Sequence, residues 1–346
     1  LELSQGSRRL EILPYVVARG QRGPADEGDP FFDGSELDGR VGLDVSYGLG
    51  TAFTLDATVN PDCGQVEADP AVVNLTAFET YFREQRPFFV EDARIFDFNM
   101  GSGQRSLFYS RRVGRAPHGG PPQGAEFTDA PEATTILGAA KLTGRTDQGL
   151  SIGALVALTQ EEEGEAYFPD TGEFRKYGVE PRSTYGVFRL QQDFSEGQSR
   201  VGGLMTASTR NLPADGTFDG LPSNAYSAGL DFEHTWGNRE WGIWGFFTGS
   251  HVTGDSTAMI RIQRASNHYW QRPDLEWATL DSTATSLTGA DWHLQFERRA
   301  GHWTGAVWAG EITSAVEVND LGFNTDAERL ASGFQVAWQE VRPTQY

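Results

Sequence analysis

The sequence predicts an all-β protein, namely an antiparallel transmembrane β-barrel of about 12–14 strands. Three observations support this fold class: apolar and polar residues alternate at period two, short turns alternate with long polar loops, and no apolar run reaches the roughly 18–20 residues of a transmembrane helix. Glycine is abundant, at 41 of 346 residues, and interrupts nearly every stretch with helical spacing. A helical membrane protein is therefore excluded, whereas a barrel hides its apolar surface in the alternation.

Five segments show the alternation most clearly, each with one apolar face and, in most of them, a polar opposite face. A half-exposed strand has this pattern, although a soluble β-sandwich would show it too. The apolar faces consist of Phe53, Leu55, Ala57 and Val59; Leu150, Ile152, Ala154, Val156 and Leu158; Leu230, Phe232 and Trp236; Trp292, Leu294 and Phe296; and Phe334, Val336 and Trp338.

The connections between these segments separate the two fold classes. Outer-membrane barrels have tight turns at the periplasmic rim and long loops at the outer rim, whereas a sandwich has no reason to sort its loops by length. We expect short turns near 48–51, 146–149, 195–198, 237–239 and 299–301, and long loops near 21–39, 160–182, 211–223, 253–283 and 314–331.

Region 61–133 interrupts this order. The strand near 53–60 ends on the long-loop side and the strand near 134–145 begins there, so the region crosses the barrel not at all or as one pair. Three strands before the region and nine after it give about 12 in total, or about 14 with the extra pair. Both termini then lie on the short-turn, periplasmic side, and we treat 1–346 as one outer-membrane β-barrel domain.

Tryptophans support the barrel more weakly. Several lie within or at the ends of predicted strands, where an aromatic girdle at the membrane interface would lie, although ordinary cross-strand packing is the alternative. They are Trp236, Trp241, Trp244, Trp303, Trp308 and Trp338.

The charge balance bears on partners. The chain has 28 Lys+Arg against 48 Asp+Glu, a formal charge of −20, which argues against nucleic acid because phosphate neutralisation needs clustered cations. We expect outer-membrane lipid and lipopolysaccharide as surroundings. Cys63 is the only cysteine, so neither a disulfide nor a cysteine-ligated zinc site is available.

Region 60–115 mixes carboxylates with arginines, and its prolines Pro70 and Pro87 argue against continuous central strands. We predict that part of it folds into the barrel lumen as a plug, pinned by arginine–carboxylate pairs to the wall, because the arginine fork satisfies several acceptors at once. An outer loop packed on the rim is the alternative. The candidate lumenal charge cluster consists of Glu67, Asp69, Glu79, Arg86, Glu91, Arg111 and Arg112.

The same region carries a resemblance to a known family. Its motifs are Asn60-Pro61-Asp62, 65–70 (QVEADP), 73–79 (VNLTAFE), 86–89 (RPFF) and 107–112 (LFYSRR), with 39–44, 271–273 and 318–323 outside it. The chain resembles bacterial outer-membrane proteins of unknown function that join a family-9 carbohydrate-binding-like domain to a C-terminal β-barrel. That domain is absent here, family members tend to continue further, and Cys63 stands where an aromatic residue is usual. A fragment or a shorter relative is therefore expected, and the resemblance supplies no catalytic residue.

No catalytic motif is present, and the histidines are dispersed without metal-ligand spacing. They are His118, His234, His251, His268, His293 and His302. The acidic loop 26–38 offers Asp26, Asp29 and Asp33 as weak candidates for a structural calcium, with a solvated loop as the alternative, and 161–165 is a second acidic stretch. No other cofactor is expected.

These observations favour a channel, a transport-related protein or a barrel anchor, linked through the resemblance to carbohydrate handling. Its partners would be a carbohydrate or small solute and other periplasmic or outer-membrane proteins. One alternative is a barrel-embedded hydrolase, which needs His234 or His293 to converge with carboxylates; an enzyme is the less favoured reading. The other is a secreted, carbohydrate-binding β-sandwich.

Overall fold

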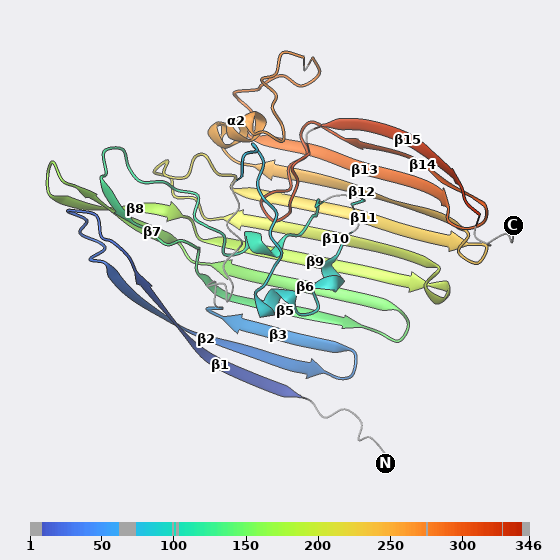
Figure 1. Cartoon of the computed structure of the whole chain (residues 1–346), viewed down its shortest axis with the longest axis horizontal. Coiled ribbons are helices and arrows are strands. Elements are labelled where there is room, and N and C mark those ends of the chain that lie inside the picture. Colours follow the sequence, from blue (N-terminus) through green and yellow to red (C-terminus); the bar gives the residue numbers. More distant parts are fainter. Residues whose placement is uncertain are drawn as a thin grey trace, which may run out of the picture.

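The computed structural model describes residues 9–61, 74–98, 100–101, 104–274, 276–326 and 328–340. Twelve strands form one sheet in the order β1-β2-β3-β5-β6-β9-β10-β11-β12-β13-β14-β15, with every neighbouring pair antiparallel (Figure 1). The strands are β1 (Leu10–Arg22), β2 (Ser35–Leu49), β3 (Phe53–Val59), β5 (Ile136–Arg145), β6 (Leu150–Thr159), β9 (Ser183–Phe194), β10 (Ser199–Arg210), β11 (Asn224–Trp236), β12 (Trp241–Thr253), β13 (Ser286–Arg298), β14 (Trp303–Ile312) and β15 (Arg329–Trp338).

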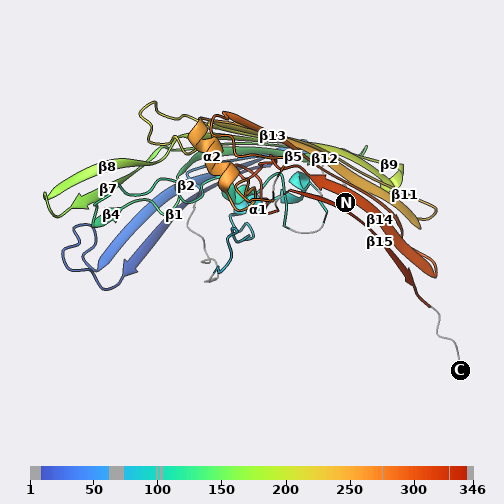
Figure 2. The ribbon, with the colours of Figure 1, turned by 90° about the horizontal axis from the view of Figure 1, so that it is seen from above.

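The sheet is an up-and-down meander that curves into an arc with a concave and a convex face (Figure 2). The predicted antiparallel, barrel-type sheet is confirmed. Its twelve strands match the lower of the two predicted counts, in which region 61–133 adds no strand to the sheet. β1 and β15 are the two edge strands, and within the described residues no pairing joins them. A sandwich would need a second large sheet against the first; the other described sheet has three strands.

The alternation of connections is as predicted. Short turns join β2 to β3, β5 to β6, β9 to β10, β11 to β12 and β13 to β14, whereas long segments follow β1, β3, β6, β10, β12 and β14. Each short turn contains a glycine with positive φ, such as Gly149 (84°) and Gly301 (98°), a conformation that side-chain-bearing residues rarely adopt. Sequence patterning therefore located both rims of the sheet.

Two of the long segments have more structure than a loop. Within 160–182, β7 (Glu162–Phe168) and β8 (Glu173–Glu180) form a hairpin that pairs with β4 (Phe127–Asp129). Within 253–283, α2 (Ser256–Arg264) begins after Asp255, whose Oδ1 accepts a hydrogen bond from Ala258 N at 2.9 Å. The expectation of plain loops was wrong here. β7 and β8 begin with charged residues and have no sustained apolar–polar alternation, and the nine-residue α2 is shorter than the roughly 11–18 residues over which helical periodicity is readable.

The polarity of the sheet is inverted relative to a soluble protein. On β11, Leu230 is 65% exposed on the convex face, whereas Asp231 beside it is 7% exposed and faces inward. Phe334 on β15 is 81% exposed. The predicted apolar faces of β3, β6, β11, β13 and β15 thus largely lie on the outside. Their inward-facing neighbours include buried polar residues such as Asp56 and Asp291, and on β6 also the apolar residues Leu155 and Ala157.

The hydrophobic core lies between the concave face and the segment that follows β3. This segment contains α1 (Pro87–Val90), with 3-10 turns at Ala93–Phe96 and Ser110–Arg112, and in its described part it adds no strand to the large sheet. Its apolar side chains pack against inward-facing residues of the sheet; the cluster includes Phe88, Phe89, Phe96, Phe98 and Leu107 with Leu155, Val187, Leu204 and Phe246. No helix in the described residues is long and apolar enough to cross a membrane.

Candidate functional site

The candidate site is the concave face together with the described residues of 74–115, called the plug segment below. Lys141 of β5 joins the two: its side chain is 1% exposed, and Nζ donates to the carbonyl oxygens of Phe88 and Glu91, each at 2.7 Å. Asp56 of β3 lies directly opposite in register, and its Oδ2 is 3.7 Å from Nζ. One buried ammonium therefore both pairs with a wall carboxylate and holds the end of α1.

Glycines in the wall let the plug segment approach closely. A Cβ on Gly153 of β6 would lie 2.7 Å from Ile95 Cγ2, and one on Gly229 of β11 would lie 2.6 Å from Phe98 Cζ. Both distances are too short for real carbon contacts, so only glycine leaves room for these side chains. Thr143 Oγ1 adds a polar contact, donating to Asp92 Oδ2 at 2.8 Å.

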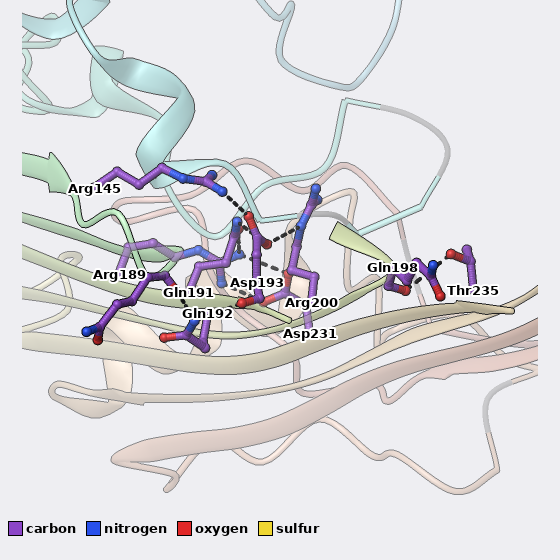
Figure 3. A network of polar contacts seen from close by, with 10 residues as sticks. Arg145, Arg189, Gln191, Gln192, Asp193, Gln198, Arg200, Asp231 and Thr235 are labelled. Carbon is purple, nitrogen blue, oxygen red and sulfur yellow. Dashed lines mark hydrogen bonds and ion pairs between the residues drawn. The ribbon is translucent and has the colours of Figure 1, made fainter. Parts of the chain in front are cut away.

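A charged network lines the concave face on the short-turn side. Arg189 of β9 donates to both carboxylate oxygens of Asp231, at 2.5 and 2.9 Å, and its guanidinium carbon is 5.3 Å from the ring centre of Phe98. Arg145 and Arg200 point toward Asp193, at 2.6 and 3.4 Å (Figure 3). This part of the wall is thus charged, and Arg189 also contacts the plug segment through Phe98.

A cavity of about 370 Å³ lies between the plug segment and β12–β15. Its wall holds a row of rings in which His293 stacks on Trp244, with ring centres 4.6 Å apart, and lies 6.1 Å from Trp308. Arg105 of the plug segment forms an ion pair with Asp291, which is buried on β13. A flat aromatic surface beside fixed charges suits a small polar solute with one apolar face.

The structure divides the predicted charge cluster. Arg112 pairs with Glu79 at 2.8 Å and donates from Nε to Gly322 O at 2.9 Å, so it ties the plug segment to the connection between β14 and β15. Arg86 pairs with Glu84 at 2.7 Å, inside the segment.

The other members of the predicted cluster lie apart from these pairs. Arg111 donates to Arg83 O at 2.8 Å, and Glu91 contributes its carbonyl to Lys141. Glu67 and Asp69 lie outside the described residues.

The contacts to the strands come mainly from residues that sequence reasoning had not selected. Lys141, Arg189 and Asp291 stand on strands, and Arg105 had been noted only as one of several arginines. The available signal was a lone cation inside an otherwise apolar strand, as in Ala140-Lys141-Leu142. Its partner Asp56 is far away in sequence, and only the register of β3 against β5 reveals the pair.

The tryptophans fall into two groups, apart from Trp241, which is half-buried at the start of β12. Trp236, Trp303 and Trp338 are exposed at the short-turn ends of β11, β14 and β15, where a girdle would lie. Trp244 and Trp308 instead line the cavity. His234 is exposed on the convex side, opposite to His293, so these two histidines do not converge on one site.

The calcium candidates have local partners. Asp29 Oδ1 accepts from Phe31 N at 2.8 Å, and Asp33 Oδ1 accepts from Ser35 N at 3.2 Å, as in ordinary turns. Across the described ranges, no group of three or more His, Cys, Asp and Glu is arranged to hold a metal ion. Calcium binding at Asp26, Asp29 and Asp33 stays a prediction.

A buried ion pair lies at the long-loop rim. His268, 2% exposed, contacts Glu317 Oε2 through Nε2 at 2.9 Å and Ser314 O through Nδ1 at 2.9 Å. Burial opposes protonation of His268, but the hydrogen bond and charge of Glu317 outweigh it, and the pKa of His268 is raised. Burial likewise opposes ionisation of Glu317, yet His268 and Asn319 N hold its pKa below the ordinary value. Each partner therefore favours the charged form of the other, an imidazolium beside a carboxylate.

Solved structures with similar strand arrangements include a porin, the outer-membrane channel DcaP of Acinetobacter baumannii, and OmpT of Vibrio cholerae. The porin is 10% identical at a TM-score of 0.31, covering 87% of this chain and 84% of its own. DcaP is 10% identical at a TM-score of 0.32, with 95% of this chain and 97% of DcaP covered. OmpT is 9% identical at a TM-score of 0.29, with 96% of this chain and 98% of OmpT covered. Because these TM-scores are low, the fold is assigned from the strand order and the burial pattern of this chain, and not from these likenesses.

No curated protein matches the chain. A family model described as a domain of unknown function (DUF5916) matches residues 7–346, which is nearly the whole length. The chain belongs to the DUF5916 family.

Proposed function

We propose that the chain forms the wall of an outer-membrane β-barrel, with its convex face in lipid and its long-loop rim among lipopolysaccharide. The observation that carries this proposal is the inverted polarity: exposed apolar side chains cover the outside of the sheet, while ion-paired residues such as Lys141, Arg189 and Asp291 are buried on the inside. Lipid is the surrounding in which such an exposed apolar face is stable. The resemblance found in the sequence points to the same location.

The concave face then serves as the lining of a conduit for small solutes, narrowed by the plug segment. Part of this face is charged, as an aqueous path requires, whereas apolar residues such as Leu155 and Val187 pack against the plug segment. Trp244, His293 and Trp308 offer a stacking surface for the ring of a sugar, which favours a carbohydrate or a similar polar solute. A barrel that only anchors other periplasmic or outer-membrane proteins is the second candidate, because the plug segment fills much of the concave side.

Conductance across a planar bilayer distinguishes a conduit for small solutes from a barrel that only anchors other proteins. We expect the protein to conduct weakly, and Lys141→Met to raise the single-channel conductance because α1 loses its anchor to the wall. Lys176→Met is the matched control, since Lys176 is exposed on β8 and its Nζ is 3.7 Å from Glu163. Electrical silence of both the wild type and Lys141→Met, with normal insertion, would contradict the conduit and favour the anchor.

A further inference from the structure

A second cavity, of about 320 Å³, lies at the long-loop rim and is formed by five segments distant in sequence. These are the plug segment, the end of β10, the loop before β11, α2 with the residues after it, and the connection between β14 and β15. The volume suits a ligand of about monosaccharide size.

The cavity is lined by four arginines, Arg112, Arg115, Arg210 and Arg261. Two of them are neutralised by carboxylates, because Arg112 pairs with Glu79 at 2.8 Å and Arg210 with Asp320 at 2.5 Å.

The remaining carboxylates around the cavity have other partners. Glu317 is paired with His268 at 2.9 Å, and Glu180 with His118 at 2.6 Å. The lining itself holds four arginines against three carboxylates, Glu79, Glu317 and Asp320.

Arg115 is the least compensated of these cations. It is half-buried and lines the cavity, and in the described part of the chain its guanidinium has no hydrogen bond or ion pair. Burial has the largest effect and lowers its pKa, and the charges of Arg112 and Arg210 also lower it, whereas the charges of Glu79 and Glu180 raise it. A guanidinium kept beside two others without its own carboxylate is unfavourable unless an anion joins it.

Arg261 supplies a second cation from another direction. It stands in the last turn of α2 and lines the same cavity, and its one hydrogen bond to a described residue is a long one, Nη1 to Gly220 O at 3.4 Å. The planar fork of each arginine matches the two oxygens of a carboxylate or the oxygens of a phosphate.

We propose that this cavity binds a small organic anion, about the size of a monosaccharide, through a carboxylate or phosphate group held by Arg115 and Arg261. Apolar lining from Phe78, Leu221 and Ile262 contacts the uncharged part of the ligand. The site lies at the rim and does not require that the barrel conducts.

Calorimetric titration of the whole protein in detergent tests the proposal with four probes: galacturonate, glucose 6-phosphate, and the neutral sugars galactose and glucose. We expect at least one anion to bind while its neutral counterpart does not, and the preferred anion identifies carboxylate or phosphate as the recognised group. Arg115→Gln should weaken binding about tenfold or more, the loss expected for a charged hydrogen bond. Arg298→Gln, which removes a pair with Glu240 at the opposite rim, should leave affinity unchanged.

Because Arg115 is half-buried, Arg261→Gln on the surface of α2 is the second variant, and it too should weaken binding. Failure of both anions to bind the wild type, binding of neutral sugars with equal affinity, or unchanged affinity in a folded Arg115→Gln or Arg261→Gln would each overturn the proposal. An electrically silent barrel that binds an anion would contradict the conduit and support this site.

Discussion

At the scale of single residues, the concave face depends on a few buried charges. Lys141 is 1% exposed, and its neighbours are the Asp56 carboxylate and the last carbonyls of α1. A buried ammonium with several acceptors stabilises only while its partners remain, because desolvation of an unpaired ion is costly.

Lys141→Met should therefore destabilise the protein by about 3–5 kcal/mol, since it leaves Asp56 buried without its cation. Denaturant unfolding in detergent measures the loss, and Lys176→Met on exposed β8 should stay within about 0.5 kcal/mol of wild type. A double variant with Asp56→Asn should recover part of the loss. Equal stability of wild type and Lys141→Met would show that the ammonium is dispensable.

The pair of His268 and Glu317 predicts a pH optimum of stability. His268 has a pKa raised above 6.5, so its contribution is complete below pH 6.5 and disappears as pH rises through the raised value. Glu317 has a pKa lowered from 4.5, so its contribution is complete above pH 4.5 and disappears as pH falls through the lowered value. The pair stabilises most between about pH 4.5 and 6.5.

Unfolding midpoints of wild type and His268→Gln across pH 3 to 9 check this optimum. The variant should lose most stability near pH 5.5 and should differ less from the wild type at both extremes. A difference that is constant with pH would mean that the pair contributes no charge-dependent stability.

At the scale of elements, side chains of the plug segment approach the wall closely at glycines. A Cβ on Gly229 would lie 2.6 Å from Phe98 Cζ and 2.8 Å from Leu107 Cδ1, whereas one on Gly186 of β9 would meet nothing within 4 Å. The same substitution should therefore have different consequences at the two positions.

Gly229→Ala should cost about 1–3 kcal/mol through overpacking and should displace the plug segment. Limited proteolysis should then cleave within residues 74–115 faster than in the wild type, while the strands stay protected. Gly186→Ala is the control and should leave the cleavage rate unchanged. Unchanged cleavage in Gly229→Ala would mean that Phe98 and Leu107 relax without loss of docking.

Sequence patterning predicted the strands better than the plug. Alternation and short turns predicted about 12 or 14 strands, of which the large sheet has twelve, because both signals are local. The contacts of Lys141 with α1 and of Arg105 with Asp291 depend on which strands lie side by side and on how deep the segment sits. Arg115 and Arg261 likewise meet only after five segments come together at the rim. Charge composition of region 60–115 indicated a polar, inward segment but not the partner of each arginine.

At the scale of the whole molecule, the convex face exposes many large apolar side chains, and their contact with water is unfavourable. Leu230→Arg, near the middle of β11, should destabilise the protein folded in lipid vesicles by about 2–4 kcal/mol, which is the cost of a cation at the bilayer midplane. Leu75→Arg is the control, because Leu75 is 91% exposed outside the sheet. Equal folding efficiency of the two variants in lipid would contradict a lipid-facing β11.

The strand order has a consequence for the time course of folding. Every strand of the large sheet pairs with the next strand of that sheet along the chain, and short turns join five of these pairs, so those five hairpins form without long loop closure. Arg112 and Gly322, in contrast, are 210 residues apart and meet only when the last connection is in place. We therefore expect the sheet to assemble first and the plug segment to dock last, so that the concave face is open to water until the final step.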